Sequence, residues 1–120
     1  MSDLVSSSTS KRWLITLSGG RHPTSDLQAG IELALAAGAF GQEVTLVFAG
    51  NTHELLKPAP EQDEPLHRLL GSLPYYEIDQ VYALSKPEEY LPSRDDLKVV
   101  AMTPQDWATV AQRADVVVNY

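Results

Sequence analysis

The sequence predicts a three-layer α/β/α domain built on a mostly parallel sheet of five strands. Short apolar segments rich in β-branched residues alternate along the chain with segments whose apolar residues recur at helical spacing. This alternation is typical of a mostly parallel sheet with helices on both faces. The chain has 120 residues, 43% of them hydrophobic, which is enough for one core. We therefore expect a single domain over residues 12–120, after a flexible polar tail over residues 1–11.

The first strand and the first helix are expected near the start of the domain. Residues 13–17 form a short apolar run that ends in a Ser-Gly-Gly cluster, which indicates a buried strand followed by a loop. Ser25 with Gln28 three residues later has the spacing of a capping box. Apolar residues then recur at helical intervals, and Gly41 provides a stop. The pattern predicts a helix over about residues 26–40.

The next segment contains the second strand and the second main helix. Residues 44–49 are apolar and continuous rather than alternating, which suits a central strand covered on both faces. A short helical turn is expected over residues 51–56. The proline-containing stretch over residues 57–65 is interpreted as a surface loop. Leucines at helical spacing over residues 66–73 then predict a helix with one apolar face.

The last third of the chain contains three further strands. Residues 78–84, which contain Val81 and Tyr82, predict a third strand, and the valine-containing segments 97–101 and 115–120 predict a fourth and a fifth. A helical turn is expected over residues 86–90. Thr103-Pro104 combines a capping hydroxyl with proline at the first helical position, so a helix is expected to begin there.

Composition and charge exclude several classes of function. Nine scattered Lys and Arg residues face sixteen Asp and Glu residues, which leaves a formal net charge of −7. Such a surface repels a polyanion, so we expect no direct contact with nucleic acid. The longest apolar runs are too short to span a bilayer, and the serine-rich start of the chain lacks the apolar region of a secretory signal. We expect a cytoplasmic protein with no membrane contact.

The residue inventory indicates neither a catalytic centre nor a metal or cofactor site. Cysteine is absent, which excludes a thiol nucleophile and a zinc thiolate site. His22, His53 and His67 lack the helical spacing of metal ligands. A hydrolase or transferase that uses His53, Glu54 or Ser85 is a remote hypothesis, because an exposed helical histidine and an ordinary N-cap serine explain these residues.

Several segments follow one another in an order that is known from one protein family. Residues 37–44 lead from the end of a helix into an apolar strand, which is followed by a short helical stretch at 51–56. Leu69-Leu70-Gly71 and then Tyr76-Glu77-Ile78 precede the third strand, and an aspartate opens the closing hydrophobic strand at 115–120. In this order the chain resembles, over residues 12–120, the TusC/DsrF subunits of the DsrE/DsrF-like sulfur-relay family.

The resemblance implies a DsrE-like fold and a place in a complex of the TusBCD/DsrEFH kind. In these complexes TusC-like chains join TusD/DsrE-like and TusB/DsrH-like chains. Persulfide sulfur passes along cysteines of successive proteins, toward 2-thiouridine of transfer RNA or, in sulfur oxidisers, through oxidative metabolism. The sulfur-carrying cysteine belongs to the TusD/DsrE-like chain. We therefore expect a non-catalytic subunit that supports this sibling, contacts sulfur carrier proteins only indirectly, and forms a hetero-oligomer, or a homo-oligomer when isolated.

The loop after the first strand is the candidate ligand site. Open α/β sheets commonly bind ligands at the carboxyl ends of their strands, and Gly19 and Gly20 would let the backbone approach an anion whose charge Arg21 could balance. The spacing is neither a P-loop nor a dinucleotide fingerprint, and a plain loop is the favoured interpretation. The alternative function is a stand-alone DsrE-like homo-oligomer that binds a small anionic ligand at this loop.

A cluster of tyrosines in the second half of the chain is the candidate subunit interface. Tyrosine combines apolar area with a polar tip and is therefore common at interfaces. Local packing around the third strand explains the cluster about equally well. The family resemblance favours a subunit contact, formed by Tyr75, Tyr76, Ile78 and Tyr82.

Overall fold

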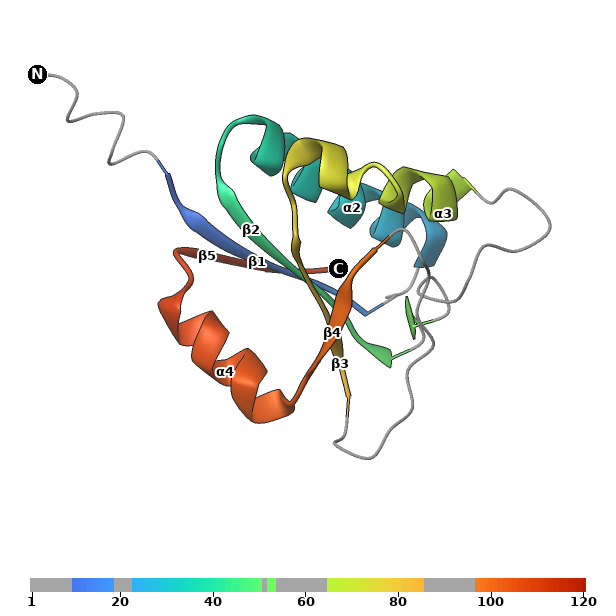
Figure 1. The fold of residues 1–120 in the computed structure, drawn as a ribbon. Helices are drawn as coiled ribbons and strands as arrows, with labels where there is room; N and C mark the ends of the chain where they lie inside the picture. The colour runs from blue at the N-terminus through green and yellow to red at the C-terminus, as the bar shows by residue number, and fades with distance from the viewer. Residues whose placement is uncertain (1–9, 19–22, 51, 54–64, 86–96) are drawn as a thin grey trace, which may run out of the picture.

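The computed structural model describes residues 10–18, 23–50, 52–53, 65–85 and 97–120 (Figure 1). In these ranges the strands and helices alternate along the chain. They are β1 (Arg12–Leu17), α2 (Pro23–Ala39), β2 (Glu43–Phe48), α3 (Pro65–Leu70), the 3₁₀ helix η2 (Leu73–Tyr76), β3 (Gln80–Leu84), β4 (Val99–Met102), α4 (Pro104–Arg113) and β5 (Val116–Asn119).

The five strands form one sheet in the order β4-β3-β2-β1-β5, and every neighbouring pair is parallel. The predicted α/β class with a five-stranded sheet is confirmed, and the sheet is entirely parallel rather than mostly parallel. The last strand in the sequence lies beside the first, with Trp13 opposite Val116. Figure 1 shows α2 and α3 on one face of the sheet and α4 on the other, which makes the three predicted layers.

The hydrophobic core has two unequal parts. The larger part lies between the sheet and the α2 side, where Ile15, Leu46 and Ile31 are fully buried. The smaller part lies under α4 and is built on Leu14, Val47 and Met102 of the sheet. β2 contributes to both parts, because successive side chains of a strand point to opposite faces. This two-sided burial explains why its apolar run is continuous.

Helix α2 begins three residues earlier than its sequence pattern predicts. Its first residue is Pro23, a residue well suited to the first helical turn because it has no N–H to satisfy. Ser25 therefore lies inside the first turn, and the prediction that Ser25 caps the helix is wrong. The predicted stop is confirmed. Gly41 has a φ of 81°, and the N–H of Gln42 donates to the carbonyl of Ala37, as expected for a glycine-terminated helix.

The predicted helix over residues 66–73 is divided into two elements. The α-helix α3 ends at Leu70, and the 3₁₀ helix η2 begins at Leu73. Pro74 lacks the N–H that would continue an α-helix, so the chain closes tighter 3₁₀ turns instead. Ser72 supports the break, since its hydroxyl donates to the Leu69 carbonyl at 2.6 Å.

Helix α4 begins where the sequence predicts. The Thr103 hydroxyl accepts a hydrogen bond from the Asp106 N–H at 3.1 Å, and the Asp106 carboxylate accepts one from the Thr103 N–H at 3.3 Å. This reciprocal pair is a capping box. No residue of α4 is fully buried, so the helix covers the sheet only in part. The expected turn over residues 86–90 lies outside the described residues.

Candidate functional site

Polar side chains lie at both ends of the parallel strands. The sequence predicts a ligand where the strands end, and we call this side of the sheet the carboxyl edge. There the Thr52 hydroxyl lies 3.1 Å from the carbonyl oxygen of Leu17 and 2.8 Å from that of Ala49. His53 Nε2 lies 3.1 Å from the carbonyl oxygen of Phe48, an acceptor, so this nitrogen carries the proton in that contact. These contacts connect the segment after β2 to the ends of β1 and β2, which gives Thr52 and His53 a structural role.

Two other described residues at this edge also form hydrogen bonds within the protein. The Ser18 hydroxyl donates to the carbonyl of Tyr120 at 3.1 Å. Ser85 is buried, and its N–H donates to the carbonyl of Met102 at 2.9 Å. Gly19, Gly20 and Arg21 lie outside the described residues, so the anion site at this loop stays a prediction. Glu54 also lies outside them.

The four residues of the predicted interface do not share one surface. Tyr75 and Tyr76 lie on η2 and are exposed. Ile78 is only 3% exposed and belongs to the core on the α2 side, where it packs against Gly38. Tyr82 packs under α4 on the opposite face, and its hydroxyl donates to the Gln80 side chain at 2.8 Å. Only Tyr75 and Tyr76 have the exposed area that a subunit contact needs.

A cleft of about 480 Å³ opens at the other edge, where the parallel strands begin. Its volume falls within the usual range for ligand pockets. We call it the amino-edge cleft. Its walls come from the starts of β1 and β2, the approach to β3 and the end of α4. It is lined by Arg12, Trp13, Gln42, Glu43, Val44, Thr45, Glu77, Asp79, Gln80, Val110, Arg113 and Ala114. The sequence analysis did not identify this site, although charged residues precede several of its apolar runs.

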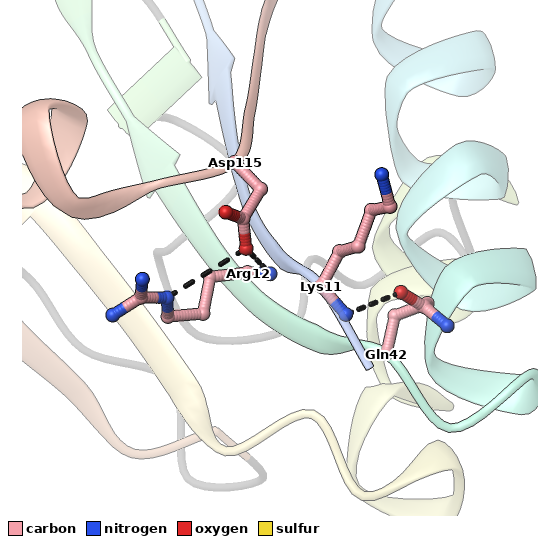
Figure 2. Close-up of polar contacts among 4 residues, drawn as sticks. All are labelled: Lys11, Arg12, Gln42 and Asp115. Carbon is pink, nitrogen blue, oxygen red and sulfur yellow. Dashed lines mark hydrogen bonds and ion pairs between the residues drawn. The ribbon is translucent and has the colours of Figure 1, made fainter. Parts of the chain in front are cut away.

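Polar contacts fix the β1 side of the cleft (Figure 2). The Asp115 carboxylate accepts a hydrogen bond from the Arg12 N–H at 2.9 Å and lies 3.7 Å from Arg12 Nε. Beside this pair, the Gln42 side-chain oxygen accepts a hydrogen bond from the Lys11 N–H at 2.8 Å. Asp115 therefore holds Arg12 at the mouth of the cleft while it neutralises part of the arginine charge.

The environment of Asp115 favours its charged form. The backbone N–H of Arg12 that donates to this carboxylate is the largest cause, and the positive charges of Arg12 and Lys11 act in the same direction. Together they outweigh the opposing effect of desolvation and hold the pKa of the Asp115 carboxyl below its ordinary value.

Three further carboxylates line the cleft, and one of them, Glu43, is the register partner of Arg12. Glu43 opens β2, and Glu77 and Asp79 lie in the segment between η2 and β3. No described residue forms an ion pair or hydrogen bond with these three carboxylates. Glu77 has a φ of 61°, a left-handed conformation in which a residue with a Cβ is strained.

Three exposed aromatic side chains adjoin the cleft, and we call them the aromatic patch. Phe40, just after α2, is 83% exposed, and Tyr75 and Tyr76 of η2 are 87% and 40% exposed. The end of α2 touches η2, because a Cβ on Gly38 would lie 3.0 Å from the carbonyl oxygen of Tyr76. Figure 1 shows the end of α2 and η2 at the same end of the sheet. The sequence analysis did not single out Phe40, because the helix pattern alone does not reveal which of its residues stay exposed.

The described residues contain no group of three His, Asp or Glu side chains that could hold a metal ion. Within those same ranges, none of the helices combines the length and apolar character needed to cross a membrane.

Comparisons with known proteins address the fold. No protein-family model matches the sequence, and no curated protein matches it. Among solved structures, the crystal structure of the YchN protein from E. coli, a DsrE-like protein, superposes with a TM-score of 0.72. The two chains are 17% identical, and the alignment covers 92% of this chain and 99% of YchN. This chain has the DsrE-like fold. The resemblance noted from the sequence is thus confirmed for the fold.

The DsrE-like fold places the two polar regions of the molecule at opposite ends of its strands. Ser18, Thr52 and Ser85 lie at the carboxyl ends, and their described polar groups mostly bond to the protein itself. The amino-edge cleft and the aromatic patch lie where the strands begin and leave charged and aromatic groups open to solvent. Among the residues that the structure describes, these charged and aromatic groups open to solvent are therefore gathered at the amino edge.

Proposed function

We propose that this chain is a non-catalytic subunit of a sulfur-relay assembly of the TusBCD/DsrEFH kind, in which it supports a cysteine-bearing sibling. One observation carries the proposal: the chain has a DsrE-like fold over nearly its whole length, and none of its 120 residues is cysteine. The order of segments that resembles TusC/DsrF chains supports the same assignment.

The chemistry of sulfur transfer separates the roles of the two chains. A persulfide passes to a new cysteine when its thiolate attacks the outer sulfur of a donor persulfide. A new sulfur–sulfur bond forms, the old one breaks and the donor thiolate leaves. Ser85, which follows β3, offers a hydroxyl, and a hydroxyl cannot form a persulfide. The sulfur must therefore be carried by a cysteine of another chain, and this chain contributes binding surface.

The hydrogen bonds at the carboxyl edge support a structural role for this chain. Thr52 and His53 bond to backbone carbonyl groups of the strand ends, and the Ser18 hydroxyl bonds to the Tyr120 carbonyl. These contacts stabilise the edge beside which a sibling chain could place its reactive cysteine.

The proposed pathway is transfer of sulfur toward 2-thiouridine of transfer RNA in the cytoplasm. The formal net charge of −7 disfavours direct contact with the RNA. The chain would contact the cysteine-bearing TusD/DsrE-like sibling and the TusB/DsrH-like sibling, and sulfur carrier proteins would meet the assembly at the sibling.

Co-expression with cysteine-bearing and TusB/DsrH-like chains from the same genome tests the proposal. Size-exclusion chromatography with light scattering should show one complex that contains all three chains. In a persulfide-transfer assay the complex should accept labelled sulfur, and a variant of the sibling with serine in place of its cysteine should accept none. A chain that stays apart from both siblings at micromolar concentration, or that takes up labelled sulfur alone, would contradict the proposal.

A further inference from the structure

The aromatic patch and the amino-edge cleft are formed by neighbouring segments of the fold. Glu77 directly follows Tyr76, and Glu43 lies three residues after Phe40 across a tight turn. The contact between Gly38 and the backbone of Tyr76 joins the two segments in space. A single partner can therefore touch the rings and the carboxylates together.

The exposure of the aromatic rings indicates contact with another protein. Phe40 and Tyr75 are the two most exposed large hydrophobic side chains of the described residues. Aromatic side chains are enriched at protein interfaces, where a few such residues provide much of the binding free energy. Two rings this exposed offer apolar area that a partner protein could cover.

The charges of the same surface favour a cationic partner. Asp115 neutralises part of the charge of Arg12, and Arg113 is the other arginine among the lining residues. The lining residues also include three acidic ones, Glu43, Glu77 and Asp79. Their carboxylates are not paired with any described residue. A Lys or Arg side chain that enters the cleft would meet these carboxylates and could also lie over an adjacent aromatic ring.

The backbone at Glu77 supports a functional role for its carboxylate. Glu77 caps η2 with a φ of 61°, a conformation that glycine adopts without strain. Glutamate at this position gives up stability, and an observed strained residue is a reason to look for a function. A carboxylate that binds a partner is such a function.

We infer that this amino-edge surface is a docking site for a partner-protein segment in which Lys or Arg side chains stand beside large apolar side chains. The aromatic patch meets the apolar side chains, and Glu43, Glu77 and Asp79 meet the cations. A polyamine fits the charges but leaves Phe40 and Tyr75 uncovered, and a nucleic acid is repelled by the carboxylates. The inference rests on the proposed function only for the identity of the partner, which we take to be the cysteine-bearing sibling.

Binding of the purified sibling to variants of the full chain tests this inference. The aromatic variant is Phe40→Ser with Tyr75→Ser, and the neutralised variant is Glu77→Gln with Asp79→Asn. Because all four residues are exposed, both variants should keep the wild-type circular dichroism spectrum. The matched apolar control is Val100→Ser with Val117→Ser, and the charge control is Glu32→Gln, all at exposed positions away from this surface.

The inference predicts that each amino-edge variant weakens the sibling's affinity by roughly tenfold or more, while the controls stay within about twofold. The affinity of the wild-type chain should fall as salt is raised, and the neutralised variant should lose most of this dependence. If the sibling binds but both amino-edge variants bind like the wild-type chain, the docking site is wrong and the proposed function still stands.

If the wild-type chain does not bind the sibling, the result counts against the proposed function. A second measurement then tests the docking site by itself. The probes are a blocked Leu-Lys-Trp-Lys-Leu peptide, the same peptide with Glu in place of Lys, and spermidine, each titrated into the labelled chain by NMR. Shifts of the amides of Glu43 and of residues 75–79 with the lysine peptide alone support the docking site. No shifts there, or equal shifts with the glutamate peptide or spermidine, overturn it.

Discussion

Asp115, the residue before β5, holds Arg12, the first residue of β1, through three contacts. Its Oδ2 accepts the Arg12 N–H at 2.9 Å and lies 3.7 Å from Arg12 Nε. The Asp115 N–H in turn donates to the Arg12 carbonyl at 2.8 Å. The beginnings of the first and last strands are thereby joined across almost the whole length of the described chain, and this junction forms one wall of the amino-edge cleft.

The junction predicts a pH-dependent contribution to stability. Because the pKa of Asp115 is lower in the folded chain than in the unfolded chain, its stabilising effect is complete above the unfolded value of about 4 and is lost as the pH falls through the folded value. Asp115→Asn should lower the urea midpoint at about pH 7, and the difference from wild type should shrink toward about pH 2.5. An equal difference at both pH values would show that the charge of Asp115 is not the cause.

A side chain at Gly30 is expected to destabilise the chain. A Cβ at this position would lie 2.5 Å from Leu17 Cδ2 and 2.9 Å from Tyr120 Cδ2, and Leu17 is fully buried and cannot move aside freely. Overpacking of this kind costs about 1–3 kcal/mol, against a gain in helix propensity of about 1 kcal/mol. Gly30→Ala should therefore lower the free energy of unfolding by about 1 kcal/mol in urea titrations. A more stable Gly30→Ala chain would show that α2 does not pack this closely on β1.

The hydrogen bond between Trp107 and Thr16 is expected to attach α4 to the sheet. Trp107 Nε1 donates to the Thr16 hydroxyl at 3.0 Å, and Thr16 is buried. A double-mutant cycle with Trp107→Phe and Thr16→Val should give a coupling free energy of about 1 kcal/mol, the usual contribution of such a bond. Additive effects of the two substitutions would show that the pair contributes little.

The capping box of α4 is expected to be important for that helix, because α4 has no fully buried residue to stabilise it. Thr103→Ala removes the hydroxyl that accepts the Asp106 N–H and should lower the free energy of unfolding by about 1 kcal/mol. Hydrogen exchange should become faster at the α4 amides in particular. Thr109→Ala is the control, since its hydroxyl only donates to the Gln105 carbonyl within the exposed middle of the helix. Equal effects of the two variants would contradict the capping role.

Replacement of Glu77 by glycine is expected to stabilise the chain. A left-handed conformation costs a residue with a Cβ roughly 1–2 kcal/mol, and the added freedom of glycine in the unfolded chain costs about 0.4–1 kcal/mol. Glu77→Gly should therefore raise the free energy of unfolding by up to about 1 kcal/mol, as measured by thermal and urea unfolding. Glu43→Gly, at the start of β2, removes the same side chain without this relief and should destabilise. A loss of stability in Glu77→Gly would show that Glu77 is not strained.

The strands and their approximate positions could be predicted because their signals are local. The continuous apolar run of β2 and the Thr103-Pro104 start of α4 each depend on residues within a few positions of one another. The candidate site could not be predicted in the same way. Phe40 and Tyr75 are 35 positions apart, and only the contact of α2 with η2 places them at one end of the sheet.

From the sequence alone come the α/β class, the approximate order of strands and helices, and the absence of any thiol among the 120 residues. The tertiary structure alone decided that β5 pairs with β1, that Ile78 is buried while Tyr75 is exposed, and that three carboxylates with no partner among the described residues line one cleft. The physical reason is the range of the forces involved. Capping, turn chemistry and side-chain periodicity act within a few residues, whereas strand pairing and burial depend on residues that only the folded chain brings together.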